Sequence, residues 1–186
     1  MMNAKRYLLE DFRYDWPFGV LDMCTRSGLT KADTEKLLSS SDVLLFSHNF
    51  RKPTLHGVRL PNRFAPIAQD VCSAFGRRGY RASLVHPVDS EPRLLGLRRS
   101  DEWITPVIVI LSSVALPVCL NILASYIKER IDKAVNRHAS GRKVLEVDIC
   151  VVETSGRRER WYKFRGNGAQ VLALLEALRY EGEGSD

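Results

Sequence analysis

The sequence predicts an α/β fold with a βαβ unit of short parallel strands, a long hydrophobic helix, and a C-terminal β-hairpin followed by a helix. Two short apolar runs flank an amphipathic helical pattern, a later stretch of 25 residues carries no charge, and an alternating run near the C-terminus is followed by a turn. We divide the 186 residues into parts 1–102, 103–137 and 144–180, which we expect to pack as one domain.

The N-terminal part is predicted to begin with a capped helix and a buried strand. Thr30 has the features of an N-cap, and Asp33 stands at the capping-box position. The apolar run 42–46 is typical of a strand that is buried on both faces, and 80–85 predicts a second strand. Residues 1–29 show no pattern that places them.

A helix is predicted between these two strands. Its apolar residues recur at helical spacing and share one face, namely Ile67, Val71, Cys72 and Phe75. A strand, a helix and a strand in about 45 residues form a βαβ unit, in which a right-handed crossover brings the strands side by side and parallel. We therefore expect Val71 and Phe75 to be buried against both strands.

The uncharged stretch 103–127 allows two interpretations. A membrane span needs about 20 mainly apolar residues, which this stretch provides. However, Pro117 lies in its middle, and a polar stripe through Asn121 and Ser125 runs on into charged residues, which favours an amphipathic helix packed in a core or on a partner subunit. We expect the stripe residues to meet hydrogen-bond partners or solvent, and the buried flank to contain Val114, Val118, Ile122 and Tyr126.

The C-terminal part is predicted to be a hairpin covered by a helix. Residues 144–152 alternate between apolar and acidic side chains, a turn around Gly156 follows, and 160–165 form the returning strand. Asn167 is expected to cap the last helix. The apolar face of that helix contains Val171, Leu174, Leu175 and Leu178.

Charge and cysteine spacing exclude several classes of protein. The net charge of +6 is spread along the chain, with 16 basic and 12 acidic residues in 1–102 and 12 and 10 after it, so neither half is a basic tail. The four cysteines form no C-x-x-C pair, and we expect neither a metal nor a cofactor. Residues 1–13 have no apolar signal-peptide core, which predicts a cytoplasmic protein, with the inner membrane as the alternative.

Histidines end both strands of the predicted βαβ unit. Ligands of open parallel sheets bind beyond the carboxyl ends of the strands, so His48 and His86 are candidates for a catalytic acid and base. Binding residues near them, including cations suited to a phosphate, are Asn49, Arg51, Lys52 and Asp89. Polar residues also end strands because the chain leaves the core there, and the sequence leaves this structural interpretation open.

A second candidate site interleaves cations with aromatic residues in the returning strand. Such a surface stacks bases and holds phosphates, and its candidate contacts are Arg158, Arg160, Trp161, Lys163 and Arg165. Aromatic residues are also ordinary strand formers. Because the run lacks the sequence pattern of RNA-recognition sheets, nucleic-acid binding is not the favoured interpretation.

The C-terminal third resembles a known module. Residues 119–180 include C-L-N-I-L-A-S-Y-I-K-E-R-I, V-L-E-V-D-I-C-V-V-E-T and W-Y-K-F-R-G-N-G-A-Q-V-L-A-L-L-E-A-L. This succession of a hydrophobic helix, a hairpin and a helix is similar to a module of small uncharacterised bacterial proteins, some of them encoded near defence or conflict genes. The resemblance implies a folding unit without an assigned activity.

Together these features predict a non-catalytic interaction or regulatory module of a bacterial system, antiphage defence included. We expect it to form a homo-oligomer, or to bind a protein partner, through the hydrophobic helix in 103–127, because large exposed apolar patches are rare on monomers. One alternative is a membrane-anchored effector that uses 104–127 as a single span. The other is a small enzyme with its site at His48 and His86.

Overall fold

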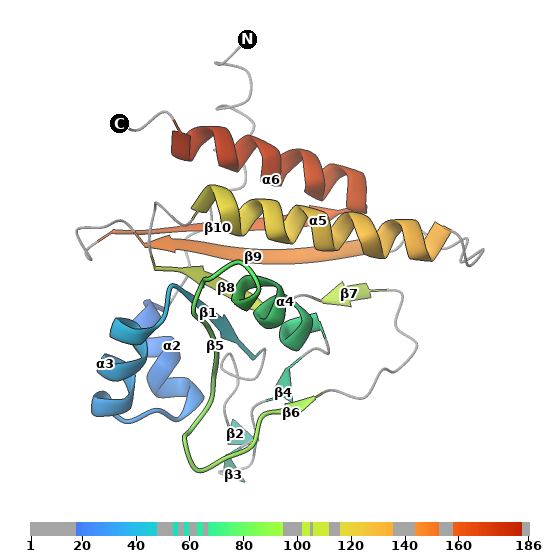
Figure 1. The fold of residues 1–186 in the computed structure, drawn as a ribbon. Helices are drawn as coiled ribbons and strands as arrows, with labels where there is room; N and C mark the ends of the chain where they lie inside the picture. The colour runs from blue at the N-terminus through green and yellow to red at the C-terminus, as the bar shows by residue number, and fades with distance from the viewer. Residues whose placement is uncertain are drawn as a thin grey trace.

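The computed structural model describes residues 18–47, 54–55, 58–59, 63–64, 67–94, 102–104, 106–111, 116–135, 144–152 and 158–183. Their centre is a mixed six-stranded sheet with the strand order β10-β9-β8-β1-β5, in which β7 also pairs with β9 (Figure 1). Its strands are β1 (Val43–Phe46), β5 (Ala82–Val85), β7 (Glu102–Ile104), β8 (Val107–Ile110), β9 (Val144–Val152) and β10 (Glu159–Gly166). The predicted α/β fold is confirmed.

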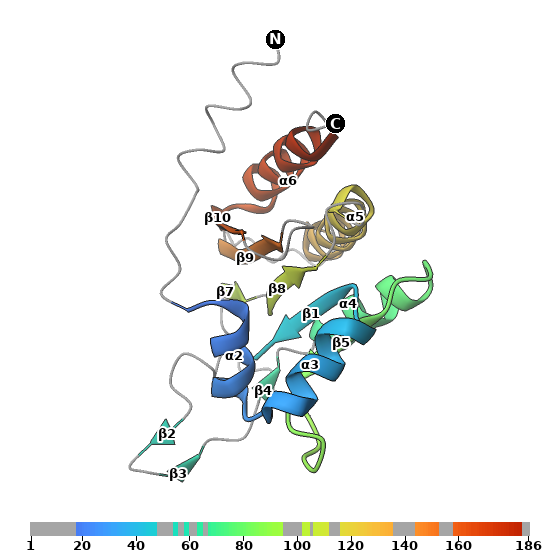
Figure 2. The same ribbon diagram turned by 90° about the vertical axis from the view of Figure 1, so that its left-hand side faces the viewer.

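Helices cover both faces of this sheet (Figure 2). One face packs against α4 (Ile67–Gly76), α5 (Leu116–Val135) and α6 (Gly168–Glu183), and the other against α2 (Val20–Ser27) and α3 (Lys31–Ser40). Two small pairs lie outside the main sheet. They are the antiparallel pair of β2 (Thr54–Leu55) with β3 (Val58–Arg59) and the parallel pair of β4 (Arg63–Phe64) with β6 (Arg93–Leu94).

The predicted βαβ unit is confirmed. Strands β1 and β5 pair in parallel, from Val43 opposite Ala82 to Phe46 opposite Val85, and α4 lies between them in the sequence. Val71 and Phe75 on α4 are 1% and 0% exposed and belong to the same core cluster as the β1 side chains. The predicted buried face of this helix is therefore correct.

The single long helix predicted over 103–137 is wrong in its first part. Residues 102–104 and 107–110 form β7 and β8, and α5 begins only at Leu116. Strand β8 lies between β1 and β9, and all four of its side chains are buried. A strand covered on both faces is apolar throughout, so its sequence has the same appearance as part of a buried helix.

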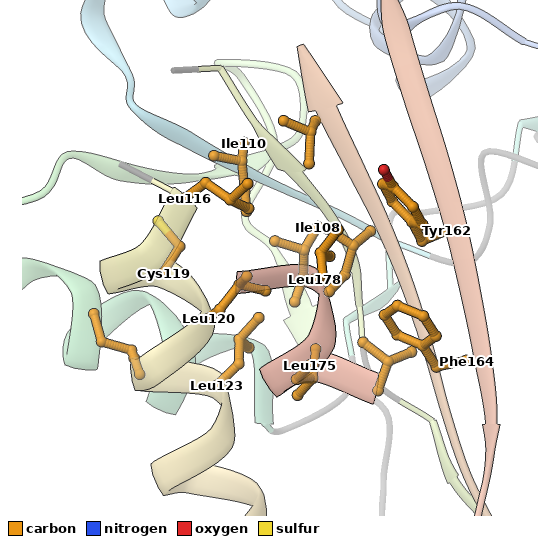
Figure 3. Packing of buried hydrophobic residues seen from close by; sticks show 14 of the residues in the cluster. Ile108, Ile110, Leu116, Cys119, Leu120, Leu123, Tyr162, Phe164, Leu175 and Leu178 are labelled. Carbon is orange, nitrogen blue, oxygen red and sulfur yellow. The ribbon is translucent and has the colours of Figure 1, made fainter. Parts of the chain in front are cut away.

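The apolar side of α5 packs into the hydrophobic core of its own chain. Figure 3 shows these side chains beside those of β8, β10 and α6. The buried residues of this helix are Leu116, Cys119, Leu120, Ile122, Leu123 and Ile127. The predicted flank is therefore off by about one residue: Ile122 is buried, Val118 and Tyr126 are part-buried, and Val114 lies outside the described residues.

The polar stripe of α5 behaves as expected. Asn121 Oδ1 accepts a hydrogen bond of 3.1 Å from Arg179 Nη1 on α6, and Ser125 is exposed. Among the helices that the structure describes, none combines the length and the apolarity that crossing a membrane requires. The stretch 104–127 is accordingly divided between sheet and helix rather than forming one continuous span.

The predicted C-terminal hairpin and helix are also confirmed. Strands β9 and β10 pair antiparallel from Glu159 opposite Val152 to Gly166 opposite Leu145, while the turn around Gly156 lies outside the described residues. Side chains of β9 and α6 share one core cluster. Asn167 caps α6 through a reciprocal pair of hydrogen bonds with Gln170, of 2.9 and 3.0 Å.

Candidate functional site

The carboxyl ends of β1 and β5 lie side by side, as the strand-end prediction requires. Phe46 is in register with Val85, and His86 directly follows Val85. Asp89 is exposed in the turn beyond it. The other residues predicted for this site lie outside the described residues, namely His48, Asn49, Arg51 and Lys52. The site itself therefore stays a prediction, while the strand pairing on which it depends is confirmed.

The His86 ring is held by its own loop. Its Nδ1 lies 2.9 Å from the carbonyl oxygen of Pro87. A carbonyl oxygen only accepts hydrogen bonds, so Nδ1 must carry the proton and donate. In the neutral ring this leaves Nε2 with a lone pair, which is the form that accepts a proton or a hydrogen bond. The contact thus fixes the orientation of the part-buried His86 ring.

The aromatic residues of β10 do not form the predicted base-stacking surface. Trp161 is buried in the cluster on the α2 side, and Tyr162 and Phe164 are buried on the opposite face of the sheet. A stacking platform needs exposed ring faces, which these three residues do not offer.

The predicted cations in and directly before this strand differ in exposure and in their partners. Arg158 and Arg165 are exposed, whereas Arg160 is part-buried. Lys163 Nζ lies 3.0 Å from Glu146 Oε1 on β9. Side chains alternate between the two faces along a strand, so Arg160 lies on the opposite face of the sheet from Lys163 and Arg165. The five residues predicted for nucleic-acid contact therefore do not share one surface.

All four cysteines lie in surroundings that favour the protonated thiol. Burial raises the pKa of the Cys24 thiol to about 11 and of Cys119 to about 12, and raises that of Cys150 further. Burial also raises the pKa of Cys72, whose Sγ lies 3.0 Å from the carbonyl oxygen of Ala82. These thiols stay protonated at neutral pH and are poor nucleophiles. Within the described residues, no group of three His, Cys, Asp or Glu side chains is placed to hold a metal ion.

Strand β5 is a different kind of feature, because it is the last strand at one end of the main sheet. The Val43 amide donates to the Arg81 carbonyl oxygen, so in this parallel pair the odd-numbered residues of β5 direct their backbone groups toward β1. The backbone groups of Ala82 and Leu84 therefore point away from the sheet. The Cys72 thiol already occupies the Ala82 carbonyl oxygen on that side.

The side chains around this edge have an asymmetric distribution of charge. The strand itself, Ala-Ser-Leu-Val, is uncharged. Three exposed cations precede it, namely Arg77, Arg78 and Arg81, of which Arg81 pairs with Asp42, and two exposed carboxylates, Asp89 and Glu91, follow it. Val88, between strand and carboxylates, is 77% exposed and is the more exposed of the two large apolar side chains found at the described surface. We call the β5 backbone edge with Arg77, Arg78, Val88, Asp89 and Glu91 the β5 edge.

The sequence contained only a faint signal for the β5 edge. Arg77 and Arg78 follow a helix end, where cations are common for reasons of the helix dipole, and a single exposed valine is ordinary. What the sequence did not contain was the strand order, which makes β5 an outer strand. The change of charge sign from one end of 77–91 to the other was the one readable hint.

Comparison with known proteins adds no relative to this description. The chain matches no protein-family model, and neither the curated proteins nor the solved structures include one that matches it significantly.

Proposed function

We propose that the protein is a non-catalytic interaction or regulatory module that binds a protein partner along the β5 edge. The observation that carries this proposal is an uncharged outer strand with outward-directed backbone groups at Leu84 and a 77% exposed Val88 beside it. Outer strands of this kind accept a further strand from another chain, with main-chain hydrogen bonds supplying affinity and flanking side chains supplying specificity.

This proposal moves the contact surface away from the hydrophobic helix. The apolar side of α5 is buried against β8, β10 and α6, as Figure 3 illustrates, so its burial is achieved within the chain. The setting in a bacterial system, antiphage defence included, rests only on the resemblance of residues 119–180.

Site-specific cross-linking in bacterial cells tests the proposal. A photoreactive phenylalanine analogue placed at Val88 should give one discrete cross-linked species on irradiation. The same analogue at Leu21, which is 62% exposed on α2, is the matched control and should give none. Mass spectrometry then identifies the attached chain. The absence of a product at position 88, or the same products at both positions, would contradict the proposed function.

A second candidate function is a small strand-end enzyme or phosphate-binding site at His86. The observation in its favour is the register of β1 and β5, which places His86 at the carboxyl ends of two adjacent parallel strands.

Titration with inorganic phosphate tests this second candidate. If the site exists, phosphate should shift the His86 ring resonances in NMR spectra and leave the backbone amides of α3 unchanged. Substitution His86→Asn should weaken the amide shifts of the neighbouring residues 87–90. Equal shifts over the whole surface would show unspecific screening and would rule out a site at this rim.

A further inference from the structure

We infer that the partner of the β5 edge is a second copy of the same chain, whose β5 pairs antiparallel around a two-fold axis at Leu84. The inference rests on the proposed function and names its partner. The β5 edge supports this choice through three features: its backbone geometry, the apolar side chains beside the strand and the order of its charges.

The backbone geometry permits a symmetric ladder. With the axis at Leu84, the Leu84 amide of each copy donates to the Leu84 carbonyl of the other, because both groups point away from their own sheet. Ala82 then lies opposite His86 of the second copy. The four residues of the strand contain neither proline nor a charged side chain, which are the usual protections of an outer strand, and Arg81 and Pro87 mark the limits of the possible ladder.

The apolar side chains next to the two ends of the strand come together in the same arrangement. Pro87, which has no amide hydrogen, and the turn 87–90 end the ladder at His86, so Val88 lies beyond the paired strands. Tyr80 is part-buried just before the strand and Val88 is 77% exposed after it, so antiparallel pairing brings each exposed valine to the end at which Tyr80 of the second copy lies. Burial of both valines supplies the hydrophobic contribution that a ladder of few hydrogen bonds lacks.

The order of the charges selects antiparallel pairing of identical chains. Antiparallel pairing brings Arg77 and Arg78, in the turn before the strand, to the same end of the ladder as Asp89 and Glu91 of the second copy, which follow the strand. A parallel arrangement would instead bring the arginines of both copies together at one end and the carboxylates together at the other. Like charges in juxtaposition disfavour a wrong pairing, whereas complementary charges fix the register.

The size of the contact indicates a weak dimer. Four strand residues and their flanks form a surface well below the roughly 1,600 Å² of a standard stable interface. We therefore expect dissociation within the accessible concentration range, which makes the dimer easy to perturb and to measure.

Charge reversal with complementation tests the inference by sedimentation velocity across a concentration series. Wild type should show a reversible monomer–dimer equilibrium. The pairs Arg77→Glu with Arg78→Glu, and Asp89→Lys with Glu91→Lys, should each weaken dimerisation by about tenfold or more, because four attractive contacts become repulsive. An equimolar mixture of the two variants should form a heterodimer more tightly than either variant alone forms a homodimer.

A control matched to the arginine variant carries the same change in charge elsewhere. Lys36→Glu with Lys128→Glu alters exposed residues of α3 and α5 and should leave the dimer unchanged. All substituted side chains are exposed, and unchanged thermal unfolding verifies that each variant is folded. A wild type that stays monomeric, or a dimer that responds equally to the control, overturns the inference.

The outcomes also separate this inference from the proposed function. A monomeric wild type whose position 88 cross-links to a different protein contradicts the second copy and leaves the proposed function standing. A cross-linked product containing two copies of the chain supports both. The absence of both a dimer and a cross-linked product contradicts both.

Discussion

Asp42 and Arg81 show how a part-buried carboxylate and an exposed guanidinium fix the start of both parallel strands. Arg81 Nη2 and Nε donate to the two carboxylate oxygens of Asp42, over 3.0 and 3.2 Å. The Arg81 amide donates to the same carboxylate, and the Asp42 amide donates to the Arg81 carbonyl. These contacts join the residues just before β1 and β5, so they hold the register of the pair at the end opposite His86.

The Asp42 contact predicts a dependence of stability on pH. Its hydrogen bond with the Arg81 side chain lowers the pKa of Asp42 in the folded chain, below the ordinary value of about 3.9 that the unfolded chain keeps. The stabilisation is therefore fully present above about pH 4 and is lost as the pH falls through the lower folded pKa. Asp42→Asn should lower the free energy of unfolding at pH 7, and its difference from wild type should shrink at pH 3.

Urea unfolding at both pH values measures this difference. Asp89→Asn is the control, because this exposed carboxylate lies at the other end of the strand, and its effect should be small at either pH. If the free energy of unfolding of Asp42→Asn lay as far below that of wild type at pH 3 as at pH 7, the carboxylate charge would not be what stabilises the strand pair.

Helix caps with partners three residues away were predictable from the sequence, whereas the direction of the backbone groups at the sheet edge was not. Thr30 accepts from the Asp33 amide at 3.1 Å, and Asn167 caps α6, both as the sequence predicts, because each cap and its partner are three residues apart. The outward direction of the Leu84 backbone depends on a strand 39 residues earlier in the sequence. No local pattern contains that information.

At the scale of elements, α2 is the helix that the sequence did not reveal. Gly19 at its N-cap has no side chain to accept a hydrogen bond from the first turn. Instead, Glu159 Oε1 on β10 accepts from the Val20 amide at 3.0 Å, and Glu159 Oε2 accepts from Trp161 Nε1 at 3.2 Å. A carboxylate at a helix N-terminus also interacts favourably with the helix dipole. The start of α2 is thus determined 139 residues away.

Removal of this distant cap should loosen α2. Glu159→Ala should lower the free energy of unfolding by about 1 kcal/mol, the usual effect of losing an N-cap. Because the lost contact is at Val20, amide hydrogen exchange should accelerate in the first turn of α2 more than in α3. Urea unfolding and exchange mass spectrometry measure the two effects.

The control for this variant is Glu35→Ala, an exposed carboxylate within α3. It should change stability by only a few tenths of a kcal/mol. If exchange in α2 were the same in Glu159→Ala and wild type, the helix would not depend on its cap from β10.

Strand β8 shows why an apolar run can be assigned to the wrong element. Its four residues Val-Ile-Val-Ile are β-branched, which favours a strand, but the uncharged sequence continues to Ile127 without a clear boundary. Val107 and Val109 face one core cluster, while Ile108 and Ile110 face the other. Periodicity cannot separate such a strand from a buried helix, because both faces are apolar.

For the whole molecule, the strand order decides which surface is available to a partner. The sequence predicted the parallel pair and the hairpin, but not that β8 joins them by pairing antiparallel with β1 and parallel with β9. That order makes β5 an outer strand and buries the α5 face on which the sequence placed self-association. The β5 edge could therefore be recognised only from the assembled sheet, and not from the composition of the chain or the spacing of its residues.

The central position of β1 also has a consequence for the order in which the chain assembles on the ribosome. Residues of β1 pair with β5 about 40 positions later and with β8 more than 60 positions later. Translation proceeds at about 5–20 residues per second, so for some seconds the emerged βαβ unit lacks the neighbour that will cover its second side. During that interval β1 itself is an unpaired apolar edge, and the nascent chain depends on β8 to close it.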